Sequence, residues 1–153
     1  MSKNKVFKFI KSFEGKWSAT EIFDNGTVFK KCALINIDEQ NDNIIKFKEL
    51  TTYNIAQSIG EFSIIYDPKA DTISRKWEHC LIPLKVEISE GNYVKVFGGY
   101  ELWENSNTIT YKFCNPGAFY ATHLVEGREQ NYNSETTFIK EEVSLSGVET
   151  LSY

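Results

Sequence analysis

One of the two arginines in this sequence stands in the middle of a predicted strand. Between Thr72 and Leu81, alternate positions place a mixed aromatic and cationic set on one side of the strand: Ile73, Arg75, Trp77, His79 and Leu81. The other side carries polar residues that do not resemble a core. We therefore predict that Arg75 points inward, where a guanidinium in apolar surroundings needs an anionic ligand group or a carboxylate such as Glu21 or Glu49. An outward Arg75 stacked over Trp77 in solvent is the alternative.

The two histidines, His79 and His123, are candidates for proton transfer. Each lies in a predicted strand with apolar neighbours, and imidazole titrates near neutral pH. Either residue can serve as a general acid or base, or it can be a hydrogen-bonded histidine of the core, and the sequence favours neither interpretation. No His-x-His, clustered Cys or Asp-x-Asp spacing accompanies them, so no metal site is predicted.

Strand carboxylates and aromatic residues complete the candidate set. Glu21 and Glu49 share alternation faces with Trp17 and Phe47, and an unpaired carboxylate in a cavity has a raised pKa, which suits proton transfer. For any single glutamate, a tilt towards solvent at a strand end is the simpler interpretation. Tyrosines can orient a ligand through the hydroxyl, although most are expected to pack in a wall. The candidate catalytic residues are His79, His123 and Glu21, and the candidate ligand-binding residues are Arg75, Trp77, Trp17, Phe47, Glu49, Tyr111 and Tyr132.

The elements that position these residues begin with a short helix, predicted over residues 3–13. Its apolar residues recur at helical spacing, with lysines on the opposite side: Val6, Phe9, Ile10 and Phe13. We expect this helix to pack on a wall or to close one end of the fold. A helix lying on a membrane surface is the less favoured alternative, because the helix is short and the protein is negatively charged.

Alternating strands separated by turn signals fill the rest of the chain. Asp24-Asn25-Gly26 is a strong hairpin signal, and Asn105-Ser106-Asn107 is interpreted as a further turn. Gly98-Gly99 inside a strand suggests a bulge or a sharp bend. The pattern predicts an all-β fold: an antiparallel up-and-down β-barrel of about 8–10 strands in a single domain, 1–153, since closure removes exposed sheet edges. An open two-sheet sandwich is the alternative.

Composition excludes several classes of function. The net charge is −4 and the lysines are dispersed among acidic residues, so no nucleic-acid partner is expected. No apolar run approaches the length of a membrane span. The three cysteines are far apart and are expected to be reduced thiols, which places the protein in the cytoplasm. Phosphate loops and dinucleotide fingerprints are missing, and no cofactor is predicted.

The order helix, Gly15-Lys16-Trp17 and strand meander resembles the lipocalin-like barrels, the calycin group. The closing stretch Val125-Glu126-Gly127, followed by Tyr132, is similar to the intracellular bacterial branch of that group. The resemblance implies a cavity for a hydrophobic or amphipathic small molecule; some relatives are haem proteins, bilin-attaching lyases or barrel enzymes. Two features depart from these relatives. Trp17 is not followed by a glycine-rich strand, as in haem-binding relatives, and Arg128 and Tyr132 do not form the Arg-x-Tyr pair of fatty-acid-binding proteins.

Three hypotheses about function follow. The first is an intracellular barrel that binds a hydrophobic or amphipathic small molecule, with Arg75 as its polar anchor. The second is a cofactor-independent barrel enzyme, a cyclase, isomerase or lyase, in which His79, His123 or Glu21 moves a proton. The third is an interaction protein with a solid barrel and an aromatic surface that serves a partner or a homodimer interface.

Overall fold

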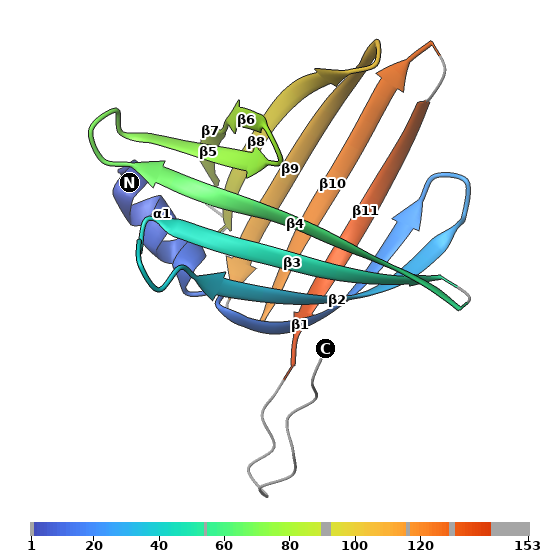
Figure 1. The fold of residues 1–153 in the computed structure, drawn as a ribbon, viewed down its shortest axis with the longest axis horizontal. Coiled ribbons are helices and arrows are strands. Elements are labelled where there is room, and N and C mark those ends of the chain that lie inside the picture. The colour runs from blue at the N-terminus through green and yellow to red at the C-terminus, as the bar shows by residue number, and fades with distance from the viewer. Residues whose placement is uncertain (1, 54, 90–92, 116, 129–130, 142–153) are drawn as a thin grey trace, which may run out of the picture.

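The computed structural model describes residues 2–53, 55–89, 93–115, 117–128 and 131–141, which form one helix and eleven strands (Figure 1). The helix is α1 (Lys3–Lys11). The strands are β1 (Gly15–Phe23), β2 (Val28–Ile37), β3 (Ile44–Tyr53), β4 (Ala56–Asp67), β5 (Thr72–Trp77), β6 (Cys80–Pro83), β7 (Lys85–Ser89), β8 (Tyr93–Leu102), β9 (Asn105–Asn115), β10 (Ala118–Gly127) and β11 (Asn131–Lys140). The predicted all-β, up-and-down architecture with a short N-terminal helix is confirmed, although the strands outnumber the expected eight to ten.

The strands form one antiparallel sheet in which strands adjacent in the chain are also neighbours, and β1 pairs with β11. The two outer strands of this order are β6 and β7, which only Leu84 separates in the chain. The stretch from Cys80 to Ser89 therefore pairs first with β5 and then with β8. The Leu84 N–H continues the first pairing by donating to the Ile73 carbonyl oxygen at 2.9 Å. This shared stretch connects the two ends of the sheet and makes the barrel nearly closed.

Two predicted strand boundaries were wrong. The strand from Thr72 ends at Trp77, and Glu78 and His79 form a turn in which Glu78 has a φ of +51°. The turn between β8 and β9 is at Trp103 and Glu104, which both have positive φ values, and not at residues 105–107. Leu102 pairs with Asn105, so only two residues connect the strands, and positive φ at both matches the twist of such a hairpin. Asparagine is common in turns, which made the later segment look like one.

Gly98 allows the closing stretch to approach β8. Pairing between β8 and β9 runs without a register shift from Val94 to Leu102, so the predicted bulge at Gly98-Gly99 is not present. A Cβ atom on Gly98 would lie 2.7 Å from the Pro83 carbonyl oxygen and 2.9 Å from Ile82 Cγ2. The glycine is needed because a side chain would occupy the place of the neighbouring backbone.

The helix and an aromatic cluster close one end of the barrel. Val6, Phe7 and Ile10 are buried, and α1 covers the end at which β1 begins (Figure 1). The helix ends at Lys11 and not at residue 13, because the next N–H groups bond to carbonyls three residues back. Five aromatic rings then pack against one another beneath it: Phe13, Trp17, Phe113, Phe119 and Phe138.

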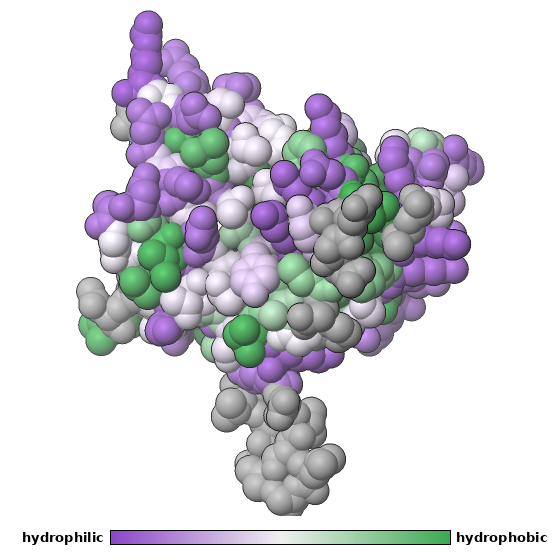
Figure 2. All heavy atoms as spheres, turned by 180° about the vertical axis from the view of Figure 1, so that it is seen from behind, coloured by the Kyte–Doolittle hydropathy of each residue, from purple (hydrophilic) through white to green (hydrophobic). Residues whose placement is uncertain are grey.

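Inward and outward side chains alternate along the walls. On β1 the buried positions are Trp17, Ala19 and Glu21, with less buried residues between them. On the outer face shown in Figure 2, apolar groups form small separate patches among polar ones. Cys32, Cys80 and Cys114 are half-buried, and none of the three is in a disulfide. Within the described ranges, no helix has the length and apolar character needed to cross a membrane.

Candidate ligand-binding site

A cavity of about 250 Å³ lies inside the barrel, beyond the aromatic cluster and towards the end that α1 does not cover. The β1–β3 wall contributes Glu21, Lys31 and Glu49 to its lining, and β5, β8 and β9 contribute Arg75, Trp77, Tyr100 and Tyr111. On one side of the cavity β4 extends past β5, because β5 pairs with β4 only from Ser63 to Asp67. The lining residues Gly60 and Glu61 belong to this extension, so the cavity opens beside it.

Arg75 is a buried cation with no counter-ion among the described residues. Its side chain is on the inward face of β5, and the residue is only 8% exposed. Nε donates to the Tyr111 hydroxyl at 3.2 Å, and the guanidinium carbon lies 4.3 Å from the centre of the Phe62 ring. Nη1 is buried without a hydrogen-bond partner, and within the described part of the chain no carboxylate forms an ion pair with Arg75. A guanidinium in this state is costly to bury, so the site is suited to an anion.

Tyr111 holds the Arg75 side chain in place. Burial raises the pKa of the Tyr111 phenol to about 12, although the positive charge of Arg75 opposes this shift. The phenol is therefore neutral at any physiological pH, and its oxygen is available as the acceptor for Arg75 Nε. Phe62 stacks on Tyr111 with 5.7 Å between ring centres, so the guanidinium is confined by one ring face and one hydroxyl.

The β1–β3 wall carries two carboxylates and one ammonium group. Lys31 Nζ lies 2.9 Å from Glu21 Oε1 and 3.5 Å from Glu49 Oε2. Burial lowers the pKa of Lys31, but the charges of Glu49 and Glu21 outweigh it and the net shift is upward. Glu21 also accepts a 2.7 Å hydrogen bond from Ser134 Oγ. Lys31 is thus charged, and the three groups together carry one net negative charge.

His123 occupies the third wall with a defined tautomer. Asn107 Nδ2 donates to the Asn105 carbonyl oxygen at 3.3 Å, which turns Asn107 Oδ1 towards His123 Nε2 at 3.0 Å. Because an amide oxygen only accepts, Nε2 carries the proton and Nδ1 of the neutral ring is the proton acceptor. Burial lowers the pKa of His123, so the neutral ring predominates near pH 7.

Six of the predicted site residues line this one cavity: Glu21, Glu49, Arg75, Trp77, Tyr111 and His123. The prediction that Arg75 points inward agrees with its position. Trp77 is half-buried beside Tyr100, with 6.3 Å between ring centres.

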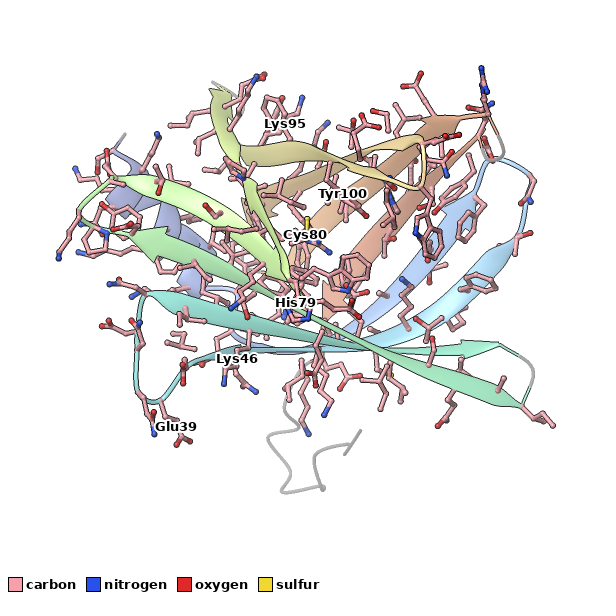
Figure 3. The ribbon with its side chains drawn as sticks, turned by 45° about the horizontal axis from the view of Figure 1, so that its top comes forward. Glu39, Lys46, His79, Cys80, Lys95 and Tyr100 are labelled. Carbon is pink, nitrogen blue, oxygen red and sulfur yellow. The ribbon has the colours of Figure 1, made fainter. Side chains whose placement is uncertain are left out.

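The other four predicted site residues do not line the cavity. His79 is exposed in the β5–β6 turn, where Figure 3 labels it beside Cys80, because the strand breaks before the alternation reaches it. Trp17 is fully buried in the aromatic cluster, and its Nε1 donates to the Phe13 carbonyl oxygen at 2.9 Å. Phe47 lies behind the lining and stacks on Phe62 at 4.6 Å. Tyr132 is half-buried above the cavity and contacts His123, with 5.6 Å between ring centres.

Sequence reasoning missed Lys31, Phe62 and Ser134, which also line the cavity, as does Tyr100, one of the tyrosines expected to orient a ligand or to pack in a wall. The signal for two of them was present in the alternation. Lys31 has the same parity as the buried Ala33 and Ile35 on β2, and Phe62 has that of Ile64 on β4. Among the described residues, no group of three His, Cys, Asp or Glu side chains could hold a metal ion.

The fold is that of a lipocalin-like barrel, of the calycin type. Among solved structures, the chain is similar to the S-type phycobiliprotein lyase CPES from Guillardia theta, with a TM-score of 0.70 and 8% identity over 94% of this chain and 95% of that one. Two weaker matches are a redesigned β-barrel (TM-score 0.48, 10% identity, 86% and 93% covered) and EF1p2_mFAP2b bound to DFHBI (0.46, 8%, 88% and 98%). No family model and no curated protein sequence matches the chain. The fold assignment rests on the lyase, and membership of the bacterial branch stays a prediction.

Proposed function

We propose that this protein binds a small amphipathic molecule in the barrel cavity, and that an anionic group of the ligand meets Arg75. The observation that carries the proposal is the buried guanidinium without a counter-ion, which opens onto a space of about 250 Å³. A carboxylate can accept two parallel hydrogen bonds from a guanidinium and offset its charge. The aromatic rings of Trp77, Tyr100 and Phe62 suit the apolar body of such a ligand.

The similarity to a phycobiliprotein lyase supports this proposal at the level of the fold, because that protein acts with the same barrel architecture. The cavity also argues against the third hypothesis, in which the barrel is packed solid. A cytoplasmic location, the lack of a nucleic-acid partner and a homodimer stay predictions from the sequence.

Native mass spectrometry of freshly purified protein tests the proposal. We expect a discrete non-covalent mass excess over the denatured mass, and we expect Arg75→Met to lose it. Arg128→Met is the matched control, since Arg128 is the second arginine of the chain and is exposed. An excess that persists in Arg75→Met would contradict the role of Arg75, and an unliganded wild-type protein would contradict the proposal.

A second candidate function is that of a barrel enzyme, and the observation that favours it is the tautomer of His123. A neutral imidazole with a fixed Nε2–H and a free Nδ1 in a cavity has the properties of a general base. Glu21 is less available for this role because Lys31 and Ser134 already occupy its oxygens. The test is to incubate the extracted ligand with wild-type protein and with His123→Phe. Conversion by the wild type alone supports catalysis, and retention of activity in the variant excludes His123.

A further inference from the structure

The charges in the cavity are separated between its walls. Arg75 on β5 carries a positive charge that no carboxylate of the described residues pairs, and its Nη1 has no hydrogen-bond partner among them. Across the cavity, Glu21 and Glu49 share one ammonium group, that of Lys31, which leaves one negative charge on the β1–β3 wall. We propose that the ligand is a compact zwitterion with an apolar or aromatic body, whose anionic group contacts Arg75 and whose cationic group contacts Glu49. This inference rests on the proposed function and narrows its ligand class.

Glu49 is the carboxylate with capacity for a ligand cation. Glu21 is held by two short contacts, at 2.9 Å to Lys31 Nζ and 2.7 Å to Ser134 Oγ. Among the described residues, Glu49 has only the longer 3.5 Å contact with Lys31, and its side chain is 21% exposed, against 12% for Glu21. Glu49 and Arg75 line the same cavity, together with Tyr111.

An anionic, a cationic or a neutral ligand leaves the charge of at least one wall without a partner. Arg75 and Lys31 balance Glu21 and Glu49, so these four charged groups of the lining are neutral as a whole. Glu61 also lines the cavity, but its side chain is exposed and lies 3.7 Å from Lys48 Nζ. An anion neutralises Arg75 but adds its charge to a cavity whose β1–β3 wall still carries one net negative charge. A cation satisfies Glu49 and leaves Arg75 buried without a counter-ion, and a neutral molecule satisfies neither. A zwitterion satisfies both walls and keeps the occupied cavity neutral, which offsets the cost of taking both ligand charges out of water.

Four probes of equal size separate these cases: 4-(aminomethyl)benzoate carries both charges, 4-ethylbenzoate the anion, 4-isopropylbenzylamine the cation, and 1-ethyl-4-isopropylbenzene neither. Their affinities for the ligand-free protein can be measured by calorimetry or by ligand-observed NMR. We expect 4-(aminomethyl)benzoate to bind at least about tenfold more tightly than 4-ethylbenzoate, the ratio that corresponds to one charged hydrogen bond. The two probes without a carboxylate should bind more weakly still.

Variants assign the selectivity to the proposed residues. Glu49→Gln should remove the advantage of 4-(aminomethyl)benzoate and leave 4-ethylbenzoate at wild-type affinity or tighter. Glu126→Gln, which changes an exposed carboxylate, is the matched control and should keep the wild-type order.

Three results would overturn the inference. If the wild type binds 4-ethylbenzoate as tightly as 4-(aminomethyl)benzoate or more tightly, the inference is wrong, but the proposal of an anionic ligand on Arg75 still stands. A selectivity that survives Glu49→Gln would also overturn the inference. Failure of all four probes would overturn the inference as well, and the native mass measurement would then decide the proposed function independently.

Discussion

The ligand-free protein should become more stable when the charge of Arg75 is removed together with the phenol that positions it. In Arg75→Met/Tyr111→Phe, a methionine of similar length replaces the guanidinium, and neither half of the 3.2 Å hydrogen bond between Nε and the hydroxyl remains. We expect the free energy of unfolding to increase by about 1–3 kcal/mol, which lies within the gain of up to about 4 kcal/mol found when buried ion pairs are replaced by well-packed apolar residues.

The magnitude follows from three opposing contributions. Burying a charge without a counter-ion costs several kcal/mol. The bond to Tyr111 and the contact with the Phe62 ring, 4.3 Å away, offset this cost by about 1.5–3 and 1–2 kcal/mol. Arg75→Met alone removes the charge but leaves the Tyr111 hydroxyl buried without a partner, at a cost of about 1–3 kcal/mol. The single variant should therefore gain little, and the double variant should gain clearly.

Urea unfolding of protein refolded without ligand measures these differences, and thermal unfolding provides a second measure at about 2–4 °C per kcal/mol. Arg128→Met is the control and should change stability by less than about 0.5 kcal/mol, because Arg128 is exposed. A double variant that is less stable than the wild type by more than about 1 kcal/mol would refute the reasoning. It would mean that the empty barrel already satisfies Arg75.

Three further predictions concern stability in urea. Gly98→Ala should destabilise the protein by about 1–3 kcal/mol, because its Cβ would lie 2.7 Å from the Pro83 carbonyl oxygen, whereas Gly60→Ala, with open space around it, should be neutral or slightly stabilising. Trp17→Ala should cost about 3–5 kcal/mol, since the ring is fully buried, and an unchanged midpoint would show that the aromatic cluster does not support the barrel. Burial lowers the pKa of His123 in the folded protein, so the neutral ring contributes to stability. This contribution is complete above about pH 6.5 and is lost as the pH falls through the folded-state pKa. His123→Gln should therefore lose less stability than the wild type between pH 8 and pH 5.

The sequence was sufficient for the architecture because the barrel depends on patterns that are local. The glycine after the helix has a φ of +143°, a value that few other residues adopt, and the tryptophan that follows is buried in the cluster beneath α1. The hairpin at Gly26 has the expected positive φ. How the barrel closes was harder to predict from the sequence. The stretch around Leu84 changes its pairing partner from β5 to β8 within two residues, and no single segment of the sequence shows that change.

The direction of a side chain could be predicted only where its strand is unbroken. Arg75 and Trp77 share β5 with Ile73, and the parity of this strand correctly gave their direction. His79 has the same parity, but Glu78 adopts a left-handed conformation and the count restarts at the turn. A glutamate at that position gives no signal of its own, since left-handed φ values usually belong to glycine or asparagine. His79 therefore remained a candidate until the three-dimensional fold separated it from His123.

Which charged groups pair with one another in the cavity was the feature hardest to predict from the sequence. Arg75 and Glu49 come from strands that are not neighbours, so no register or spacing relates them, and an ion pair between Arg75 and a carboxylate was a reasonable expectation. In the fold, Lys31 takes that place beside both Glu21 and Glu49, and Arg75 is left without a counter-ion. In the sequence, Lys31 follows Lys30 and looks like part of a solvated face. In the fold it is buried between Glu21 and Glu49, and this arrangement leaves one net negative charge on the β1–β3 wall. Either Lys31 or Arg75 could have paired with the two carboxylates, and the other cation would then lack a counter-ion. The barrel places Lys31 on a strand next to the carboxylates and Arg75 across the cavity, so Arg75 is the cation without a counter-ion among the described residues.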